Sequence, residues 1–440
     1  MKVVLVQPPN LQLTSKWKER GVYRPPLGLA ILAAYIRTYD YDVSIIDLDV
    51  TGLHTPKEAA NKIIGYSPDV IGFACLTPRY PIIVDIAREC KKISDVITIV
   101  GGPHVSGLPM YALKDENIDY GIIGEGEGAF LEFLGCIRYN RPITDVSNLI
   151  FRFRDDIVIN EARPYIKDID SLPHPAWDLL DLSYYVEPGT FKKNHLGIMS
   201  SRGCPFSCLF CASKTTWGRK VRWHSSKYVV DELEIGVNTY KTDEFFFYDD
   251  TFTLNKSRVI DICDEIKRRN LNIRFIINAR VDTVDYDIAN ILKDAGCCMV
   301  AFGIESGDPN ILKRIKKGIT REQAIAACDS LKRAGLPYYA SFIIGHPGDT
   351  RESIKATIDF ADELDPYQAK FMISTPYPGT ELYEMAVRNS LLPEGGAENL
   401  GDHTFFHHVA CNMTDISDKD LLKYEQDAFD KYEEKRRSII

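Results

Sequence analysis

The stretch SSRGCPFSCLFCAS, residues 200–213, places the three cysteines Cys204, Cys208 and Cys211 within eight residues. Thiolates bind zinc ions or iron–sulfur clusters, and a structural zinc site closes four ligands around the metal. Three thiolates on a four-iron cluster leave one iron without a protein ligand, so a small molecule can bind that iron directly. The spacing therefore favours a [4Fe-4S] cluster with an open iron. A zinc site completed by a distant Cys or His is the alternative.

A strand followed by a helix recurs six times in the chain around and after this loop. The expected strands are residues 196–200, EFFFYDD, IRFIINAR, CMVAFGIES, YYASFIIGHPG and QAKFMIST, and amphipathic stretches separate them. Repeated strand–helix units close into a curved parallel sheet. The pattern predicts a partial (β/α)6 barrel over 195–385, followed by a C-terminal capping segment over 386–440.

The first 140 residues alternate continuous β-branched runs with helical patterns, for example KVVLVQPP, DVSIIDLD, DVIGFACLT and ITIVGG. Such runs are typical of buried parallel strands joined by crossover helices. They predict a doubly wound, Rossmann-like α/β domain over 1–140, and residues 141–194 are expected to form a linker with a small hairpin. Ligands of open parallel sheets bind at the loops after the strands. Those loops carry Pro8 and Pro9, the run GGPH at 101–104, and the run GEGE at 124–127.

Composition and charge exclude several other classes of protein. The chain has 440 residues and a formal charge of -9, so nucleic acid is not an expected partner. No run of eighteen apolar residues predicts a transmembrane helix, and the N-terminus lacks the pattern of a secretory leader, which indicates a cytoplasmic protein. Most of the eleven cysteines are expected to be reduced core residues, including Cys297 and Cys298 at a strand start. We expect a monomer.

The order Cys-x3-Cys-x2-Cys after the first strand of a partial barrel, with Phe210 before the last cysteine, resembles the radical S-adenosylmethionine (SAM) superfamily. The resemblance implies that SAM chelates the open iron and is cleaved to a 5'-deoxyadenosyl radical inside the barrel, with an electron from a donor such as flavodoxin or ferredoxin. It also implies SAM contacts at the strand ends. These contacts are Phe210, Asp249, Asp250, Arg280, Glu305, Ser306 and Gly345. His346 stands where many relatives have an apolar residue, so it is a further candidate.

An α/β domain, the connector PHPAWDLLDL and a three-cysteine barrel, in this order, resemble the cobalamin-binding branch of that superfamily. The resemblance implies that cobalamin binds at the loops of the first sheet. The Asp-x-His-x-x-Gly signature that supplies a lower histidine ligand is absent, and GLHTP at 52–56 lacks its aspartate and glycine. Arg79, Tyr80 or His104 are the candidates for the lower face. The full set of expected cobalamin contacts is Pro8, Pro9, Thr77, Arg79, Tyr80, Gly101, Gly102, Pro103, His104, Gly124, Glu125, Gly126 and Glu127.

The resemblance implies a cobalamin-dependent radical SAM methyltransferase that methylates an unactivated carbon. The substrate stays open among a peptide or protein, a lipid, a tetrapyrrole and a secondary metabolite. Two alternatives remain. One is the same cofactors used for ring contraction, cyclisation or carbon–carbon bond formation without methyl transfer, and the other is a zinc-stabilised corrinoid carrier. His403, His407, His408 and Cys411 imitate a metal site, although an ordinary loop is the preferred interpretation.

Overall fold

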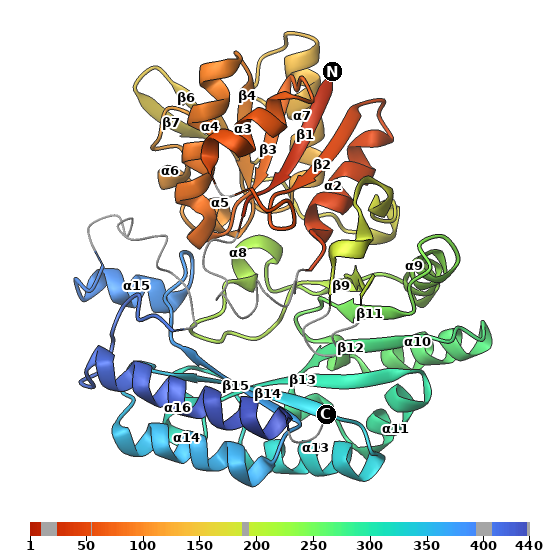
Figure 1. Ribbon diagram of the computed structural model, residues 1–440, viewed down its shortest axis with the longest axis vertical. Helices are drawn as coiled ribbons and strands as arrows, with labels where there is room; N and C mark the ends of the chain where they lie inside the picture. Colours follow the sequence, from red (N-terminus) through yellow and green to blue (C-terminus); the bar gives the residue numbers. More distant parts are fainter. Residues whose placement is uncertain (10–23, 54, 187–192, 393–406, 438–440) are drawn as a thin grey trace. The chain divides into compact units, whose positions relative to one another are not determined.

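The computed structural model describes residues 1–9, 24–53, 55–186, 193–392 and 407–437. The chain divides into two compact units (Figure 1). Unit 1 comprises Met1–His195 together with Ala212–Gly218, and unit 2 comprises Leu196–Cys211 together with Arg219–Ile440. Each unit is built on a sheet of its own, which confirms the predicted α/β class.

The sheet of unit 1 has seven strands in the order β2-β1-β3-β4-β5-β6-β7. The first five are parallel and the last two are antiparallel, so the predicted hairpin extends the edge of this sheet. The strands are β1 (Lys2–Gln7), β2 (Asp42–Asp47), β3 (Val70–Ala74), β4 (Ile97–Gly101), β5 (Tyr120–Ile122), β6 (Leu149–Phe153) and β7 (Asp156–Ile159). The longer helices are α2 (Leu27–Arg37), α3 (Pro56–Ile64), α4 (Tyr80–Ile93) and α7 (Gly126–Arg138), and α5 (Pro103–Gly107), α6 (Pro109–Ala112) and α8 (Ser213–Trp217) are short.

Residues of the connector after the hairpin are fixed to this sheet. The hydroxyl of Tyr185 donates a hydrogen bond of 2.9 Å to Oδ2 of Asp47 at the end of β2, and both residues are buried. The backbone N–H of Ala176 donates to the carbonyl of Ala30 in α2. The connector after the hairpin is therefore packed on unit 1.

The sheet of unit 2 has six parallel strands in the order β15-β14-β13-β12-β11-β8, as the strand–helix repeats predict. In the order of the chain, its strands are β8 (Leu196–Ile198), β11 (Glu244–Phe247), β12 (Arg274–Ala279), β13 (Cys297–Glu305), β14 (Tyr338–Ile344) and β15 (Gln368–Ile373). The helices between and after them are α9 (Ser226–Asn238), α10 (Lys256–Arg268), α11 (Tyr286–Asp294), α12 (Pro309–Arg314), α13 (Arg321–Ala334), α14 (Arg351–Leu364), α15 (Glu381–Arg388) and α16 (Asp418–Arg437).

The two faces of this sheet differ. On the outer face, Phe342 and Phe371 stack with centroids 5.1 Å apart, and Tyr432 of α16 lies 6.0 Å from Phe371. The face opposite to these rings is called the inner face. It carries an apolar cluster of Phe246, Ile276, Met299, Ala301 and Tyr339. Because side chains alternate along a strand, residues two positions beyond this cluster also belong to the inner face.

The first strand of this sheet is shorter than predicted. β8 ends at Ile198, whereas the sequence indicated a strand to residue 200. Ser201 and Arg202 instead form β9 (Ser201–Arg202), which pairs antiparallel with β10 (Arg222–Trp223). The strand ends early because the backbone N–H of Ser200 donates a hydrogen bond to the carboxylate of Asp249, just after β11.

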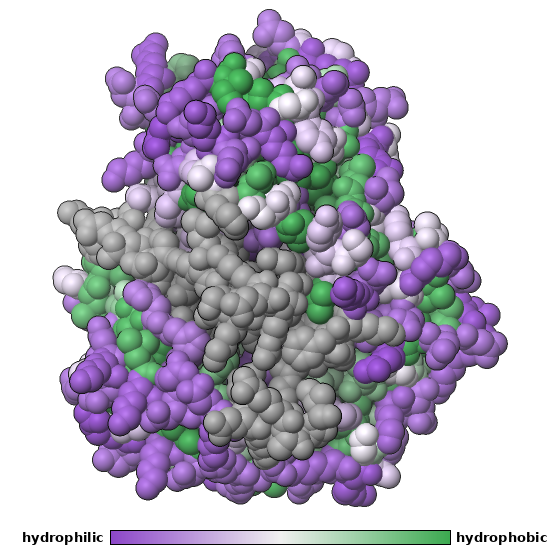
Figure 2. Space-filling model, in the orientation of Figure 1, coloured by the Kyte–Doolittle hydropathy of each residue, from purple (hydrophilic) through white to green (hydrophobic). Residues whose placement is uncertain are grey.

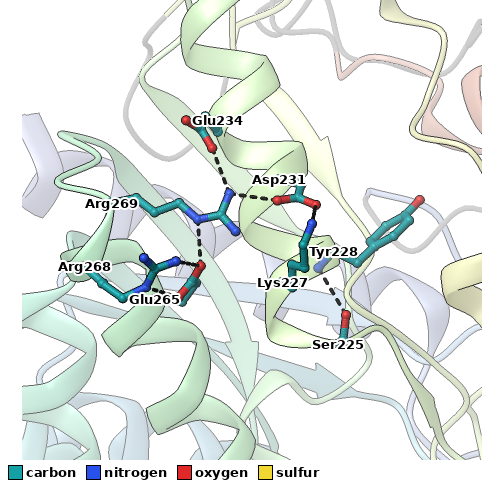
Figure 3. Close-up of polar contacts among 8 residues, drawn as sticks. All are labelled: Ser225, Lys227, Tyr228, Asp231, Glu234, Glu265, Arg268 and Arg269. Carbon is teal, nitrogen blue, oxygen red and sulfur yellow. Dashed lines mark hydrogen bonds and ion pairs between the residues drawn. The ribbon is translucent and has the colours of Figure 1, made fainter.

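Ion pairs join two of the helices that follow the first strands (Figure 3). Nη1 of Arg269, just after α10, lies 2.8 Å from Oδ1 of Asp231 and 2.7 Å from Oε2 of Glu234, both on α9. Nε of Arg269 contacts Glu265 at 2.7 Å. Hydrogen bonds from Arg268 and Arg269 lower the pKa of Glu265 to about 2.

Hydrophilic side chains cover most of the coloured surface in Figure 2, and hydrophobic ones are scattered among them. Within the described ranges, no helix combines the length and the apolar character needed to cross a membrane.

Candidate active site

Asp249, at the end of β11, holds the residues that lead into the three-cysteine loop. Its Oδ1 accepts a hydrogen bond of 2.7 Å from the backbone N–H of Ser200, and its Oδ2 accepts from the hydroxyls of Ser200 at 2.7 Å and Ser201 at 2.5 Å. Asp249 is fully buried. A buried carboxylate with three donors is a rigid anchor, because a buried acceptor that loses its donors pays its full desolvation penalty.

Arg280, at the end of β12, holds the first half of the loop. Its guanidinium carbon lies 3.5 Å from the ring centroid of Phe206, which is a close cation–π contact. Its Nε and Nη2 each donate to Asp282 at 3.0 Å, and Nη2 also donates to the carbonyl of Lys317 at 3.0 Å. The arginine therefore binds a carboxylate of the chain itself in bidentate fashion.

The second half of the loop is anchored through the buried Leu209. The backbone N–H of Leu209 donates to Ile315 at 2.9 Å, and its carbonyl accepts from Leu382 at 3.0 Å. These two backbone bonds fix the loop between α12 and α15.

The three cysteines are half-buried and none forms a disulfide. Burial raises the pKa of Cys204, while hydrogen bonds from the backbone of Phe206 and the hydroxyl of Thr251 lower it in part. Among the described residues, no three His, Cys, Asp or Glu side chains converge on a position for one metal ion. A four-iron cluster binds each thiolate on a different iron, so its ligands stand farther apart than those of a single ion. Three half-buried thiolates are a donor set that a [4Fe-4S] cluster can use.

A buried ion pair lies at the end of β13, the strand that faces the loop from the middle of the sheet. Nζ of Lys317 contacts Oε1 of Glu305 at 2.8 Å, and both side chains are buried. Glu305 has a φ of 75°, a left-handed conformation that is rare outside glycine and that interrupts the register with β14. A Cβ at Gly303 would meet Glu305 Oε1 at 2.5 Å, so the pair lies over the inner face of Gly303.

His346 follows β14 and packs against the loop. Its ring lies 5.6 Å from the ring of Phe210, and Nζ of Lys317 lies 6.0 Å from the Phe210 centroid. His346 is fully buried, its Nδ1 is 3.1 Å from the hydroxyl of Ser374, and its Nε2 has no hydrogen-bond partner among the described residues. Burial and the charge of Lys317 lower the pKa of His346 to about 3, so the imidazole is neutral.

The loops after the strands of unit 1 contain glycines with free space beside them. A Cβ at Gly101 would meet nothing within 4 Å, and one at Gly126 would meet only Leu32 at 4.0 Å. Gly102 differs, because its φ is 124° and a Cβ there would lie 2.9 Å from the carbonyl of Cys75. Backbone without side chains at this edge leaves room for a flat ligand.

Two family models match different parts of the chain. Residues 198–361 match the radical SAM superfamily, and residues 18–134 match the B12 binding domain. An uncharacterized methyltransferase of Pyrococcus horikoshii is 40% identical over 89% of this chain and 84% of its own length. An anaerobic magnesium-protoporphyrin IX monomethyl ester cyclase of Rubrivivax gelatinosus is 29% identical over 82% of this chain and 66% of its own length.

The solved structure of the radical SAM methyltransferase TsrM from Kitasatospora setae, with cobalamin and a [4Fe-4S] cluster bound, has the same fold. The TM-score is 0.72, with 19% identity over 89% of this chain and 75% of that one. The chain belongs to the cobalamin-binding radical SAM enzyme family. It is a radical SAM enzyme, and the cofactors of this family are a [4Fe-4S] cluster, SAM and cobalamin.

For this radical SAM enzyme, several of the predicted SAM contacts have partners within the chain. Asp249, Arg280 and Glu305 make the contacts described above, and the hydroxyl of Ser306 lies 3.1 Å from that of Thr357 and accepts from the N–H of Asp308. Phe210 lies in the loop, Asp250 is exposed, and Gly345 has a φ of 81°. Contact of all seven residues with SAM stays a prediction.

The predicted cobalamin contacts also divide. Nη1 of Arg79 donates to the carbonyl of Pro8 at 2.5 Å and Nη2 contacts Asp49 at 2.9 Å, and the hydroxyl of Tyr80 donates to the carbonyl of Tyr111. His104 is fully buried, with its Nδ1 3.3 Å from the hydroxyl of Thr77. All of these serve the internal packing of the radical SAM enzyme's first domain. A lower-face role for Arg79, Tyr80 or His104 stays a prediction.

The remaining predicted contacts of that domain lie at the start of its loops or helices. Glu125 accepts a hydrogen bond of 2.8 Å from the backbone of Ile166, and Glu127 is buried in the first turn of α7. Pro103 begins α5, and Gly124 has a φ of 70°. Pro9 is half-buried after β1. Their contact with cobalamin also stays a prediction.

The C-terminal histidines give no support to a metal site among the described residues. Nδ1 of His407 lies 2.8 Å from Oε2 of the buried Glu425, and the thiol of Cys411 lies 4.0 Å from the carbonyl of Leu391. His403 and His54 lie outside the described residues.

Sequence reasoning missed three residues that hold the loop: Ser200, Phe206 and Lys317. In the sequence, the serines before the cysteine motif look like ordinary polar residues. The same is true of the lysine in the basic run KRIKK.

Proposed function

We propose that this radical SAM enzyme is a cobalamin-dependent methyltransferase that methylates a carbon without nucleophilic character. The observation that carries the proposal is a three-cysteine loop in a chain that also contains a B12 binding domain. The 40% identical relative is named a methyltransferase, which supports the same reaction. When bound, the cluster and SAM supply a carbon radical that abstracts hydrogen, and cobalamin supplies the methyl group.

The residues of unit 2 have distinct tasks in this proposal. Cys204, Cys208 and Cys211 hold the cluster, and Asp249, Arg280 and Leu209 fix the loop so that the open iron keeps one position. Glu305 and Lys317 offer one negative and one positive group to the zwitterionic end of SAM. Such preorganisation reduces the reorganisation needed at the moment of reaction.

A strict test uses SAM with a deuterated methyl group under anaerobic conditions. The proposal expects 5'-deoxyadenosine and a product that carries three deuterium atoms from the methyl group, both lost in a Cys208→Ala variant. The matched control is Cys263→Ala, because Cys263 is buried in α10 away from the loop. Formation of 5'-deoxyadenosine without label in the product would exclude methyl transfer.

The second candidate keeps the cofactors and transfers no methyl group. The relative named as a cyclase favours it, since 29% identity extends over 82% of this chain. The labelling experiment separates the two reactions. A corrinoid carrier without a cluster would give neither 5'-deoxyadenosine nor broad iron–sulfur absorption after anaerobic reconstitution.

We also infer that a small electron-transfer protein such as flavodoxin or ferredoxin reduces the cluster, and that the enzyme works as a cytoplasmic monomer. Sedimentation of the anaerobic protein tests the oligomeric state. Replacing a chemical reductant by flavodoxin with its reductase tests the donor.

A further inference from the structure

The sequence around the three cysteines is basic, although the chain as a whole is acidic. Residues 188–230 contain eight lysines and arginines and no aspartate or glutamate, whereas the 440 residues together carry a formal charge of -9. An acidic macromolecule is repelled by the chain as a whole, so a local basic surface is needed to attract one. The basic run supplies such a surface wherever its side chains reach solvent.

Two residues of the basic run lie at the surface beside the cysteine loop. Arg219 and Lys220 are exposed and belong to unit 2, as the loop does. Nη1 of Arg219 donates a hydrogen bond to the hydroxyl of Ser207, which is itself exposed and directly precedes Cys208. Among the described residues, neither Arg219 nor Lys220 forms an ion pair with a carboxylate, so both charges are open to a partner.

An exposed tryptophan follows these charges in the same unit. Trp223 ends β10, is 41% exposed and pairs with Ser201 of β9. The hydroxyl of Ser201 is bonded to Asp249, so the backbone beside Trp223 is held in place. Tryptophan and arginine are enriched at protein–protein interfaces and supply much of the binding free energy there. The name basic surface is used here for Ser207, Arg219, Lys220 and Trp223.

The place of the basic surface in the fold selects the kind of partner. Ser207 is one residue from Cys208, so a protein bound to the basic surface contacts the loop that carries the cluster ligands. In the proposed function the cluster receives its electron from outside the chain, and electron transfer becomes slower as the distance grows. A protein that delivers electrons therefore has a reason to bind at this loop. Nucleic acid and anionic lipid have no such reason.

We propose that the basic surface binds an acidic electron-transfer protein, which gives one electron to the cluster and is itself oxidised by one electron. This inference rests on the proposed function, because the radical reaction needs a reduced cluster. Opposite charges on the two proteins speed their encounter and fix their orientation. The exposed ring of Trp223 adds apolar contact area at the same place.

The test measures binding of an acidic flavodoxin to the anaerobically reconstituted full chain by surface plasmon resonance, at low and at high salt. The variants are Lys220→Glu, which reverses one charge of the basic surface, and Lys220→Arg, which keeps it. Lys332→Glu, at an exposed position of α13, is the matched control. Thermal unfolding and iron content of each variant check that the fold and the cluster are retained.

We expect Lys220→Glu to weaken binding about tenfold at low salt and less at high salt, because salt screens charges at the surface. Lys220→Arg and Lys332→Glu should stay within about threefold of wild type. Absence of measurable flavodoxin binding by the wild type, or equal binding by Lys220→Glu, overturns the inference. A Lys220→Glu variant that loses binding to vesicles of anionic lipid and keeps binding to flavodoxin also overturns it.

Failure of this inference is distinguishable from failure of the proposed function. Flavodoxin binding is measured without SAM and without substrate, so it does not depend on the radical reaction. Formation of 5'-deoxyadenosine with dithionite as the reductant tests the proposed function without any protein donor. The Lys220→Glu variant should form 5'-deoxyadenosine at the wild-type rate with dithionite and more slowly with reduced flavodoxin, whereas equal slowing with both reductants contradicts a docking role.

Discussion

The guanidinium of Arg280 lies 3.5 Å from the ring centroid of Phe206, so a residue at the end of β12 holds the loop that carries the three cysteines. The same guanidinium binds Asp282 and the carbonyl of Lys317. One side chain thus connects the loop, the end of β12 and the turn that carries the partner of Glu305. The geometry of the cluster site and that of the buried ion pair depend on each other.

Replacing Arg280 by Lys should impair cluster assembly. A lysine ammonium cannot stack flat on Phe206 or bind Asp282 through two parallel bonds. We expect less iron per chain and a weaker reduced-cluster EPR signal after anaerobic reconstitution. Arg268→Lys, in an exposed ion pair of α10, should behave as wild type. Full iron content in Arg280→Lys would show that the stacking does not hold the loop.

Asp249 and Asp250 are adjacent acids whose replacement should change stability to different extents. In Asp249→Asn the new amide N–H2 would face the donors of Ser200 and Ser201, so we expect a loss of about 1–3 kcal/mol in unfolding free energy. Asp250→Asn, at an exposed position, should change stability by less than about 0.5 kcal/mol. Urea unfolding of the apo-protein measures both. Equal stability of the two variants would contradict the anchoring role of Asp249.

Asp47 should make unit 1 less stable as the pH rises. Burial, and then the charge of Asp49, raise the pKa of Asp47 from 3.8 to about 7. Between these values the folded state keeps a proton that the unfolded state has released, so stability falls with rising pH, by on the order of 4 kcal/mol over the window. Asp47→Asn removes this slope in unfolding experiments between pH 4 and pH 7.

The control for Asp47 is Asp42→Asn, which changes an exposed acid on the same strand. It should keep the wild-type slope. Parallel profiles for Asp47→Asn and wild type would mean that the carboxylate keeps its ordinary pKa despite its burial.

His346 should have the opposite influence on unit 2. Its pKa is lowered to about 3, so between about pH 3 and pH 6.5 the unfolded state binds a proton that the folded state does not. Stability therefore rises with pH across this window and is lost as the pH falls. His346→Leu fills the same apolar surroundings beside Phe210 and should flatten the acid limb of the stability profile.

His408, half-buried near the C-terminus, supplies the matched control, and His408→Leu should leave the acid limb unchanged. An acid limb that persists in His346→Leu would assign the acid sensitivity to other groups. Measuring iron content in the same samples shows whether contact with Phe210 also matters for the cluster.

Many features of the fold were predictable because they depend on short-range patterns. The strand–helix repeats predicted both sheets, and Cys297 begins β13 as the apolar run after LKDAG indicated. The end of β8 was not predictable, because it depends on the distant carboxylate of Asp249. The same holds for the bidentate contact of Arg280 with Asp282.

The sequence by itself determined the chemistry of the chain: three thiolates at a fixed spacing after a first strand, and glycines at the strand ends of an α/β domain. These features are local, so residue order alone defines them. Only the tertiary structure decided which partners the polar side chains near the strand ends contact. Asp249, Arg280 and Glu305 are all charged residues on or next to strands, and their partners lie up to 49 residues away in the chain. Strand register and backbone direction bring those partners together, and neither can be read from composition or periodicity.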